Sequence, residues 1–170
     1  MKRILLTGIS GVAKSTVTEQ LAQRGYKAVD ADGDAFSEWV EVSDELEQAA
    51  GSPVESDRDW VWREDRMQEL LSTEDTDILF VSGCAANMGK FLAQFDHIVL
   101  LTAPADVITQ RLQTRTNNAY GKHSDELSRV LSLKESVEPL LRRVAGHEID
   151  TNANLDTVVN EVLQCVQVEH

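Results

Sequence analysis

The chain has 170 residues, 42% of them hydrophobic, which suits one folded domain with a buried core and excludes an intrinsically disordered chain. Its net charge of −13, from 16 basic and 29 acidic side chains, disfavours a nucleic-acid polymer or an anionic membrane as a partner. No apolar run approaches the ~18 residues of a membrane span, and Cys84 and Cys165 are too few for a disulfide framework or a zinc site. We therefore predict a cytoplasmic protein with a single domain over residues 1–170, present as a monomer or a weak homodimer.

The first predicted elements are a strand, a glycine-rich turn and a helix. The strand covers Arg3–Leu6, and the helix begins at Lys14 and ends near Arg24, just before Gly25. Between them stands GISGVAKS, which matches the phosphate-binding pattern G-x-x-x-x-G-K-[ST] except at Ala13, where the pattern has glycine. In this context, backbone N–H groups and the positive end of the helix dipole point at a bound phosphate.

Each residue type in this turn suits nucleotide binding. Lys14 is placed to reach the β- and γ-phosphates of ATP, and the Ser15 hydroxyl to bind Mg²⁺. Ala13 keeps its backbone donor, and its methyl group costs little at negative φ and about 1–2 kcal/mol at positive φ. We therefore interpret the turn as a working nucleotide site rather than a chance glycine turn. The cofactor-binding residues predicted here are Gly8, Ser10, Gly11, Val12, Ala13, Lys14, Ser15 and Thr16.

Alternating apolar runs and helical patterns fill the rest of the chain, which predicts βα units around a parallel sheet. The segment 36–72 is predicted as two helices broken at Gly51-Ser52-Pro53, forming a helical substrate-binding insert. The polar, turn-rich segment 115–123 is predicted as an exposed lid. The other predicted elements are strands Tyr26–Val29, Ile78–Val81, His97–Thr102 and His147–Ile149, and helices Gly89–Phe95, Pro104 to about Thr114, Ser124–Val144 and one after the N-cap Asn154.

Three later stretches extend the pattern begun by GISGVAKS. Asp30-Ala31-Asp32 follows the second predicted strand, Trp62-Arg63-Glu64 lies in the insert, and LLTAPADVITQRLQTR carries Arg111 and Arg115 toward the lid. Together they resemble the D-x-D, the F-R-x-x-E helix and the strand–helix–lid passage of the small P-loop kinases, the group of shikimate, gluconate and adenylate kinases. The resemblance implies a three-layer α/β P-loop NTPase fold, in which a five-stranded parallel sheet of order 2-3-1-4-5 has helices on both faces and a small lid.

The chain also departs from the shikimate kinases within this group. They carry G-G-G after the third strand, where this chain has the segment from Ser82 to Asn87, SGCAAN. They place an arginine before a P-L-Y motif to hold the substrate carboxylate, where Val137 and Glu138 precede Pro139 here. We therefore expect an acceptor other than shikimate.

Two acidic residues at the end of the second strand are candidates for the phosphoryl-transfer chemistry. In-line transfer needs one carboxylate to orient the acceptor hydroxyl and another to steady Mg²⁺. By resemblance Asp32 takes the hydroxyl and Asp30 the metal side, and Asp34 is the substitute for either. The alternative interpretation of DADGD is a solvated acidic turn.

Several basic and polar residues are further candidates, each with a structural alternative. Arg63 and Arg66 either clamp the substrate or pair with neighbouring acids on the surface. Arg115 is expected to neutralise charge on the γ-phosphate with Lys122 when the lid closes, and Arg111 either assists or pairs with Asp106. The remaining substrate candidates, beside Asp32, Asp34 and Arg63, are Ser82, Gly83 and Asn87.

The sequence thus predicts an ATP- and Mg²⁺-dependent kinase that phosphorylates a hydroxyl group of a small metabolite, with Lys14, Asp32 and Arg115 as catalytic residues. A nucleoside or nucleotide kinase is the alternative among enzymes. A regulatory or resistance protein that binds ATP without transfer is the alternative from another class. Asp32 and the lid separate these functions, because a protein that only binds ATP needs neither.

Overall fold

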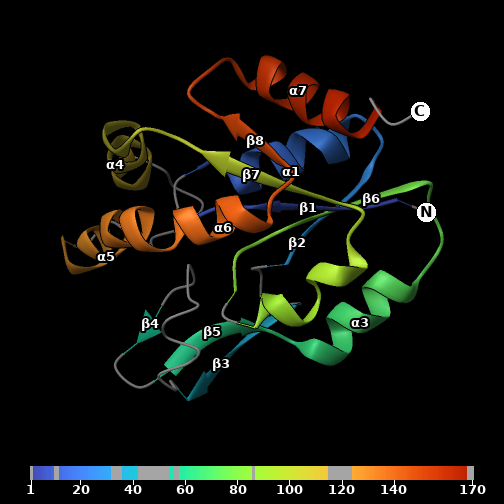
Figure 1. Ribbon diagram of the computed structural model, residues 1–170, viewed down its shortest axis with the longest axis horizontal. Coiled ribbons are helices and arrows are strands. Elements are labelled where there is room, and N and C mark those ends of the chain that lie inside the picture. The colour runs from blue at the N-terminus through green and yellow to red at the C-terminus, as the bar shows by residue number, and fades with distance from the viewer. Residues whose placement is uncertain are drawn as a thin grey trace.

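The computed structural model describes residues 2–9, 12–31, 36–41, 54–55, 58–85, 87–114 and 124–167. A five-stranded parallel sheet runs through the molecule in the order β2-β6-β1-β7-β8 (Figure 1). Numbered among themselves, these strands stand in the order 2-3-1-4-5, so the predicted sheet is confirmed. The strands are β1 (Lys2–Thr7), β2 (Lys27–Asp30), β6 (Ile78–Ser82), β7 (His97–Thr102) and β8 (His147–Asp150).

The central strand β1 begins with two charged residues and continues as a short apolar run. Its first two residues are partly exposed, and the four that follow, from Ile4 to Thr7, are buried. Ile4 pairs with Phe80 of β6 on one side and with His97 of β7 on the other. A strand enclosed in this way has no solvent face, which explains why its sequence is continuously apolar instead of alternating.

Helices cover both faces of the sheet (Figure 1). On one face α1 and α7 lie side by side, and on the other lie α6, α3 and two short 3₁₀ turns, which replace the predicted helix Gly89–Phe95. The amide N–H of Asp156 donates to the Asn154 side chain at 2.9 Å, so the predicted N-cap of α7 is confirmed. The helices are α1 (Lys14–Gln23), α3 (Glu64–Ser72), α4 (Ala105–Thr114), α5 (Ser124–Ser136), α6 (Glu138–Val144) and α7 (Leu155–Gln167), with turns η1 (Met88–Lys90) and η2 (Leu92–Gln94).

The predicted helical region, about Ser124–Val144, consists of two helices, α5 and α6, separated at Val137. Pro139 lies in the first turn of α6, where its missing N–H is tolerated. The same missing donor prevents α5 from continuing through this point. None of the helices among the described residues is long and apolar enough to cross a membrane.

The interpretation of residues 36–72 as two helices is wrong for three stretches that the structure describes as strands. Strands β3 (Ser37–Glu41), β5 (Arg58–Trp62) and β4 (Val54–Glu55) form an antiparallel sheet in the order β3-β5-β4, and among the described residues of this segment α3 is the helix. In the register of β3 and β5, Trp39 lies opposite Trp60. SEWVE and RDWVW are rich in aromatic and β-branched residues, which favour strands.

The three-stranded sheet is joined to the core through the last residue of β5. Trp62 is only 1% exposed, and its ring centroid lies 6.0 Å from that of Phe91 in the turn after β6. Its burial therefore holds the carboxyl end of β5, and with it the start of α3, against the main sheet.

Candidate functional site

The phosphate-binding turn begins immediately after β1, at Gly8. A Cβ atom on Gly8 would lie 2.7 Å from Cγ2 of Val12 and would also collide with the carbonyl oxygen of Leu101 in β7. Val12 itself is fully buried under the turn. Only glycine allows the backbone to pass this close to β7, so Gly8 fixes where the turn leaves the sheet.

The Lys14 side chain folds back across the turn. Its ammonium group donates hydrogen bonds to the carbonyl oxygens of Gly8 and Ile9, the second at 2.9 Å. These partners hold a positive charge directly above the carboxyl end of β1. This is the edge of an open α/β sheet at which ligands bind.

Ala13 adopts the left-handed conformation, with φ 70° and ψ 25°. The sequence left open whether φ of Ala13 is negative or positive, and the structure has the positive value. This conformation costs about 1–2 kcal/mol for a residue with a Cβ atom. Ala13 is also the N-cap of α1, and no side chain among the described residues caps it with a hydrogen bond. The first N–H groups of α1 thus open toward the turn, which is the arrangement that attracts anions.

Ser15 and Asp30, the two residues predicted on the metal side, lie together. The Ser15 hydroxyl, in the first turn of α1, donates to Oδ2 of Asp30 at the end of β2, at 3.2 Å. A hydroxyl beside a carboxylate fits Mg²⁺, which takes one or two protein oxygens, several waters and phosphate oxygens. The described residues contain no group of three or more His, Cys, Asp or Glu side chains placed to hold a metal, so phosphate oxygens would have to complete this site.

Buried hydroxyl groups fix α1 against the neighbouring strand. Thr18 Oγ1 lies 2.7 Å from the carbonyl oxygen of Lys14 and 2.7 Å from Oγ of Ser82, the last residue of β6. Ser82 is 1% exposed, and its carbonyl oxygen accepts a hydrogen bond from Ala31. Ser82 therefore joins α1, β6 and β2 beneath the turn, and contact with a substrate stays a prediction for this residue.

Asn87 and Arg63 meet where the three-stranded sheet enters α3. The Asn87 side chain accepts from the Trp62 N–H at 3.0 Å and donates to the Trp62 carbonyl oxygen at 2.8 Å. Arg63, the N-cap of α3, donates through its backbone N–H to Phe36 and through Nε to the carbonyl oxygen of Ser37 at 3.2 Å. Arg63 thus holds the segment that leads into β3, and Asn87 holds the end of β5. Their contact with a substrate stays a prediction.

Glu64, the first residue of α3, pairs with Lys90, the last residue of η1. Its carboxylate accepts from Lys90 Nζ at 3.0 Å and from Asn87 Nδ2 at 3.3 Å. The hydrogen bond from Lys90, and after it the one from Asn87, lowers the pKa of Glu64. The pair is exposed, so its stabilising effect on the fold is modest.

Arg111, predicted to bind the cofactor, lies in the last turn of α4 against the end of β8. Its guanidinium donates to the Thr151 hydroxyl at 2.8 Å and to the Thr151 carbonyl oxygen at 2.7 Å. Burial lowers the pKa of Arg111, and the charge of the adjacent Asp150 opposes this effect. The cation is therefore fixed at the carboxyl end of β8, on the same sheet edge as the phosphate-binding turn.

This geometry agrees with the family comparison. A family described as an AAA domain matches residues 4–132, which is more than half of the chain. The chain belongs to this AAA-domain family. The matched segment includes the whole turn, the Ser15–Asp30 contact and Arg111. No curated protein matches the sequence of this AAA-domain chain.

Solved structures share the fold of this AAA-domain chain at low sequence identity. A shikimate kinase from Acinetobacter baumannii in complex with shikimate is 22% identical, with a TM-score of 0.67 over 99% of this chain and 94% of that one. A gluconokinase from Sinorhizobium meliloti 1021 is 21% identical, with a TM-score of 0.57 over 95% and 89%. A sugar kinase from Janibacter sp. HTCC2649 is 18% identical, with a TM-score of 0.56 over 98% and 95%. The fold is that of the small P-loop kinases.

The structure accounts for some of the predicted site residues of the AAA-domain chain and not for others. It brings Gly8, Val12, Ala13, Lys14, Ser15 and Asp30 together around the turn, while Thr16 is exposed on α1 and Gly83 donates its N–H to Leu6 at 3.0 Å. The lid 115–123, which includes Arg115, and four further predictions lie outside the described residues. These four are Ser10, Gly11, Asp32 and Asp34.

Two residues of the site were not predicted from the sequence. Thr18 stands one helical turn after Lys14, and Thr151 follows directly after β8. The position of Thr18 on the inner face of α1 is visible from its spacing, because residues four apart share one side of a helix. Thr151 has no comparable signal, since its partner Arg111 comes from a distant helix.

Proposed function

We propose that the protein is a phosphotransferase that uses ATP and Mg²⁺ to phosphorylate a hydroxyl group of a small metabolite. The observation that carries this proposal is the contact between Ser15 and Asp30 beside the Lys14 ammonium group. A turn that only bound phosphate would need no carboxylate at the end of the neighbouring β2. A carboxylate next to the serine suits a metal-bound nucleotide.

In this proposal Lys14 exchanges its carbonyl partners for phosphate oxygens, and the open N–H groups at the start of α1 bind the same phosphates. Ser15 and Asp30 hold the metal, directly or through water. Mg²⁺, when bound, supplies positive charge against the phosphate oxygens. The contribution of the chain is positioning and neutralisation of charge, with little covalent chemistry.

The acceptor side of the reaction is also part of the proposal. Asp32 orients the acceptor hydroxyl, with Asp34 as its substitute, and Arg115 meets the γ-phosphate. Arg63, Ser82, Gly83 and Asn87 complete the substrate site, and the protein acts in the cytoplasm as a monomer or weak homodimer. The three solved structures named above support a small hydroxyl-bearing acceptor, because their names give shikimate, gluconate and sugars as substrates. The net charge of −13 supports a small molecule over a nucleic-acid polymer or a membrane.

The direct test is ADP formation from ATP and Mg²⁺ in the presence of sugars, sugar acids, polyols, nucleosides and nucleotides, one at a time. The expected result is acceptor-dependent turnover with one small class of compounds. Lys14→Met keeps the length of the side chain and removes its charge, and should lower this turnover by roughly 10²-fold or more. Turnover with nucleosides alone would indicate the nucleoside-kinase alternative. ATP binding without turnover of any acceptor would contradict the proposed transfer.

A further inference from the structure

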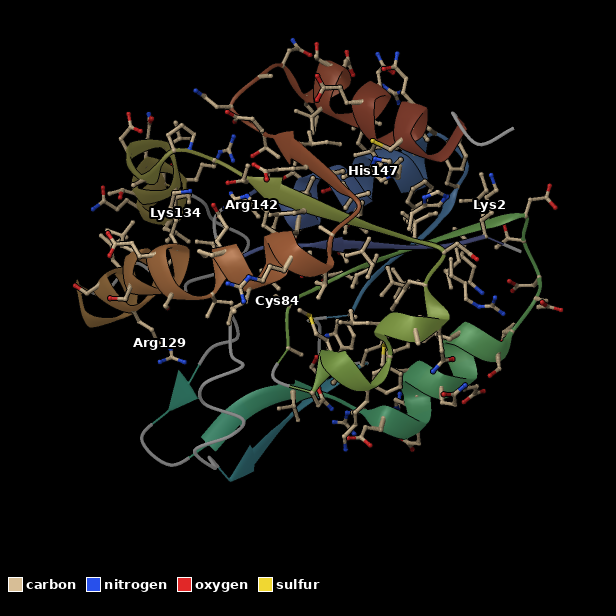
Figure 2. The ribbon with its side chains drawn as sticks, in the orientation of Figure 1. Lys2, Cys84, Arg129, Lys134, Arg142 and His147 are labelled. Carbon is tan, nitrogen blue, oxygen red and sulfur yellow. The ribbon has the colours of Figure 1, made fainter. Side chains whose placement is uncertain are left out.

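The strand β3 forms an edge of the three-stranded sheet. In the order β3-β5-β4 it pairs with β5 on one side, and no strand among the described residues pairs with its other side. Figure 1 shows β3 along the lower border of the molecule, and in Figure 2 the side chain of Arg129 reaches toward the same sheet from α5, on the opposite side. An unpaired edge is a template for a strand from another chain.

The hydrogen bonds between β3 and β5 determine which main-chain groups point to this edge. The N–H of Arg63 donates to the carbonyl oxygen of Phe36, one step before the first pair of the register. Hydrogen-bonded and non-hydrogen-bonded pairs alternate along antiparallel strands. The N–H and carbonyl groups of Ser37, Trp39 and Glu41 therefore point away from β5.

Only the first of these three residues uses an outward main-chain group within the part of the chain that the structure describes. The carbonyl oxygen of Ser37 accepts from Nε of Arg63 at 3.2 Å. No hydrogen bond joins the outward groups of Trp39 or Glu41 to another described residue. Since main-chain groups are obligatory hydrogen-bonding groups, these must bond to water or to a strand from outside.

The sequence of β3, SEWVE, can pair with a second copy of itself in an antiparallel register centred on Trp39. Each Glu38 then lies opposite Val40 of the second copy, and each Glu41 lies opposite Ser37. No carboxylate faces a carboxylate in this register, so the like-charge repulsion that destabilises directly opposite pairs is avoided. A shift by one pair in either direction shortens the paired stretch, and one of the two shifts sets Glu38 against Glu38.

We propose that β3 pairs with β3 of a second copy of this chain, antiparallel and centred on Trp39, to form a symmetric dimer. Trp39 lies opposite Trp60 of β5, so the pairing sets Trp60, Trp39 and their copies in line across the joined sheets. Cross-strand aromatic pairs stabilise antiparallel sheets. Two chains of net charge −13 repel each other, so the dimer is weak and salt strengthens it. This inference does not depend on the proposed phosphotransferase function.

Sedimentation equilibrium of the full chain over a range of protein concentrations tests the dimer. Glu41→Pro removes an outward N–H and leaves the bonds to β5 intact, since proline is tolerated on the free side of an edge strand. The matched control is Glu41→Gln, which removes the charge and keeps the N–H. Glu41→Pro should weaken dimerisation by roughly tenfold or more, and Glu41→Gln should dimerise at least as well as wild type. Raising NaCl from about 0.05 M to about 0.5 M should strengthen the wild-type dimer.

Oxidative cross-linking tests the register. In the proposed dimer the two copies of residue 39 have Cα atoms about 5.5 Å apart, within the reach of a disulfide, which ends near 7 Å. The two copies of residue 60 are three strand spacings apart, about 14 Å. Trp39→Cys should therefore form a disulfide-linked dimer, and Trp60→Cys, the matched control, should not. Both variants keep Cys84 and Cys165, so cross-linking through these is the same in both.

Three results would overturn the proposal. The first is a monomer at every concentration and both salt levels, without cross-linking of Trp39→Cys, which would make β3 an edge protected by its glutamates. The second is a dimer unchanged by Glu41→Pro and not trapped by Trp39→Cys, which would use another face. The third is equal cross-linking of the two cysteine variants. If Glu41→Pro lowers the melting temperature, the comparison of Trp39→Cys with Trp60→Cys decides by itself.

Discussion

Asn87 pairs with the main chain of Trp62 as a neighbouring strand would. Its side-chain oxygen accepts from the Trp62 N–H at 3.0 Å, and its nitrogen donates to the Trp62 carbonyl oxygen at 2.8 Å. Asn87 is 7% exposed, so water does not compete for these groups. This contact ties β5 to the segment that follows β6, and so fixes the position of the three-stranded sheet relative to the phosphate-binding turn.

The first prediction follows from this pairing. Asn87→Ala removes two buried hydrogen bonds to the N–H and carbonyl groups of Trp62 and should lower the free energy of unfolding by about 2–3 kcal/mol. Gln68→Ala is the control, because Gln68 is exposed and its hydrogen bonds with Gln94 and Ser72 lie at the surface, so its effect should stay within about 0.5 kcal/mol. Urea denaturation measures both. Unchanged stability of Asn87→Ala together with a raised KM for the acceptor would assign Asn87 to the substrate instead.

The second prediction concerns the left-handed Ala13. Because φ is 70°, Ala13→Gly should raise the free energy of unfolding by about 1 kcal/mol. Gly25→Ala is the reciprocal control, because its φ is 96° and a Cβ there meets nothing within 4 Å, so strain alone should destabilise this variant. Gly89→Ala, with equal space and no positive φ, should stay close to wild type. Lower stability of Ala13→Gly in the same denaturation experiment would contradict the left-handed conformation.

Much of the fold could be predicted from the sequence because its signals are local. The strand before GISGVAKS, the N-cap at Asn154 and the apolar face of α7 each depend on a few neighbouring residues. The segment 36–72 was predicted as two helices, whereas pairing between β3 and β5 makes residues 37–41 and 58–62 strands. Pairing of distant segments cannot be read from one of them alone.

The candidate site, like the fold, could be predicted from the sequence only in part. GISGVAKS predicted the turn, and the resemblance to the small P-loop kinases placed Asp30 on the metal side, where it lies beside Ser15. The two bonds from Arg111 to Thr151 arise from packing between α4 and the residue after β8, which are distant in the chain. No pattern of residue types along the chain specifies them.

The third prediction is a pH dependence at Glu64. Its folded-state pKa lies below the ordinary value of 4.5, chiefly because Lys90 donates a hydrogen bond to it. A lowered folded pKa contributes stability above about pH 4.5, and this contribution is lost as the pH falls through the lower folded value. A carboxyl NMR titration should show the lowered pKa in wild type and a return toward 4.5 in Lys90→Met. An identical titration in both proteins would show that Lys90 is not the cause.

The last prediction separates a kinase from a protein that only binds ATP, and it compares two aspartates around the end of β2. Asp30→Asn keeps the size of the side chain beside Ser15 and removes the charge proposed to hold Mg²⁺, so the Mg²⁺ concentration for half-maximal turnover should rise by roughly tenfold or more. Asp32→Asn should leave ATP and Mg²⁺ affinity nearly intact and lower transfer by roughly 10²–10⁴, because the acceptor hydroxyl loses the carboxylate proposed to take its proton.

The two effects are measured on the same samples used for melting temperature, with turnover recorded across a Mg²⁺ titration. A structural Asp32 would lower the melting temperature, and turnover would fall only as far as the folded fraction does. If Asp32→Asn transfers phosphate to the acceptor at the wild-type rate, Asp32 is not the catalytic carboxylate, and Asp34 becomes the residue to test. If Asp30→Asn changes transfer but not its Mg²⁺ dependence, the Ser15–Asp30 contact serves the acceptor rather than the metal.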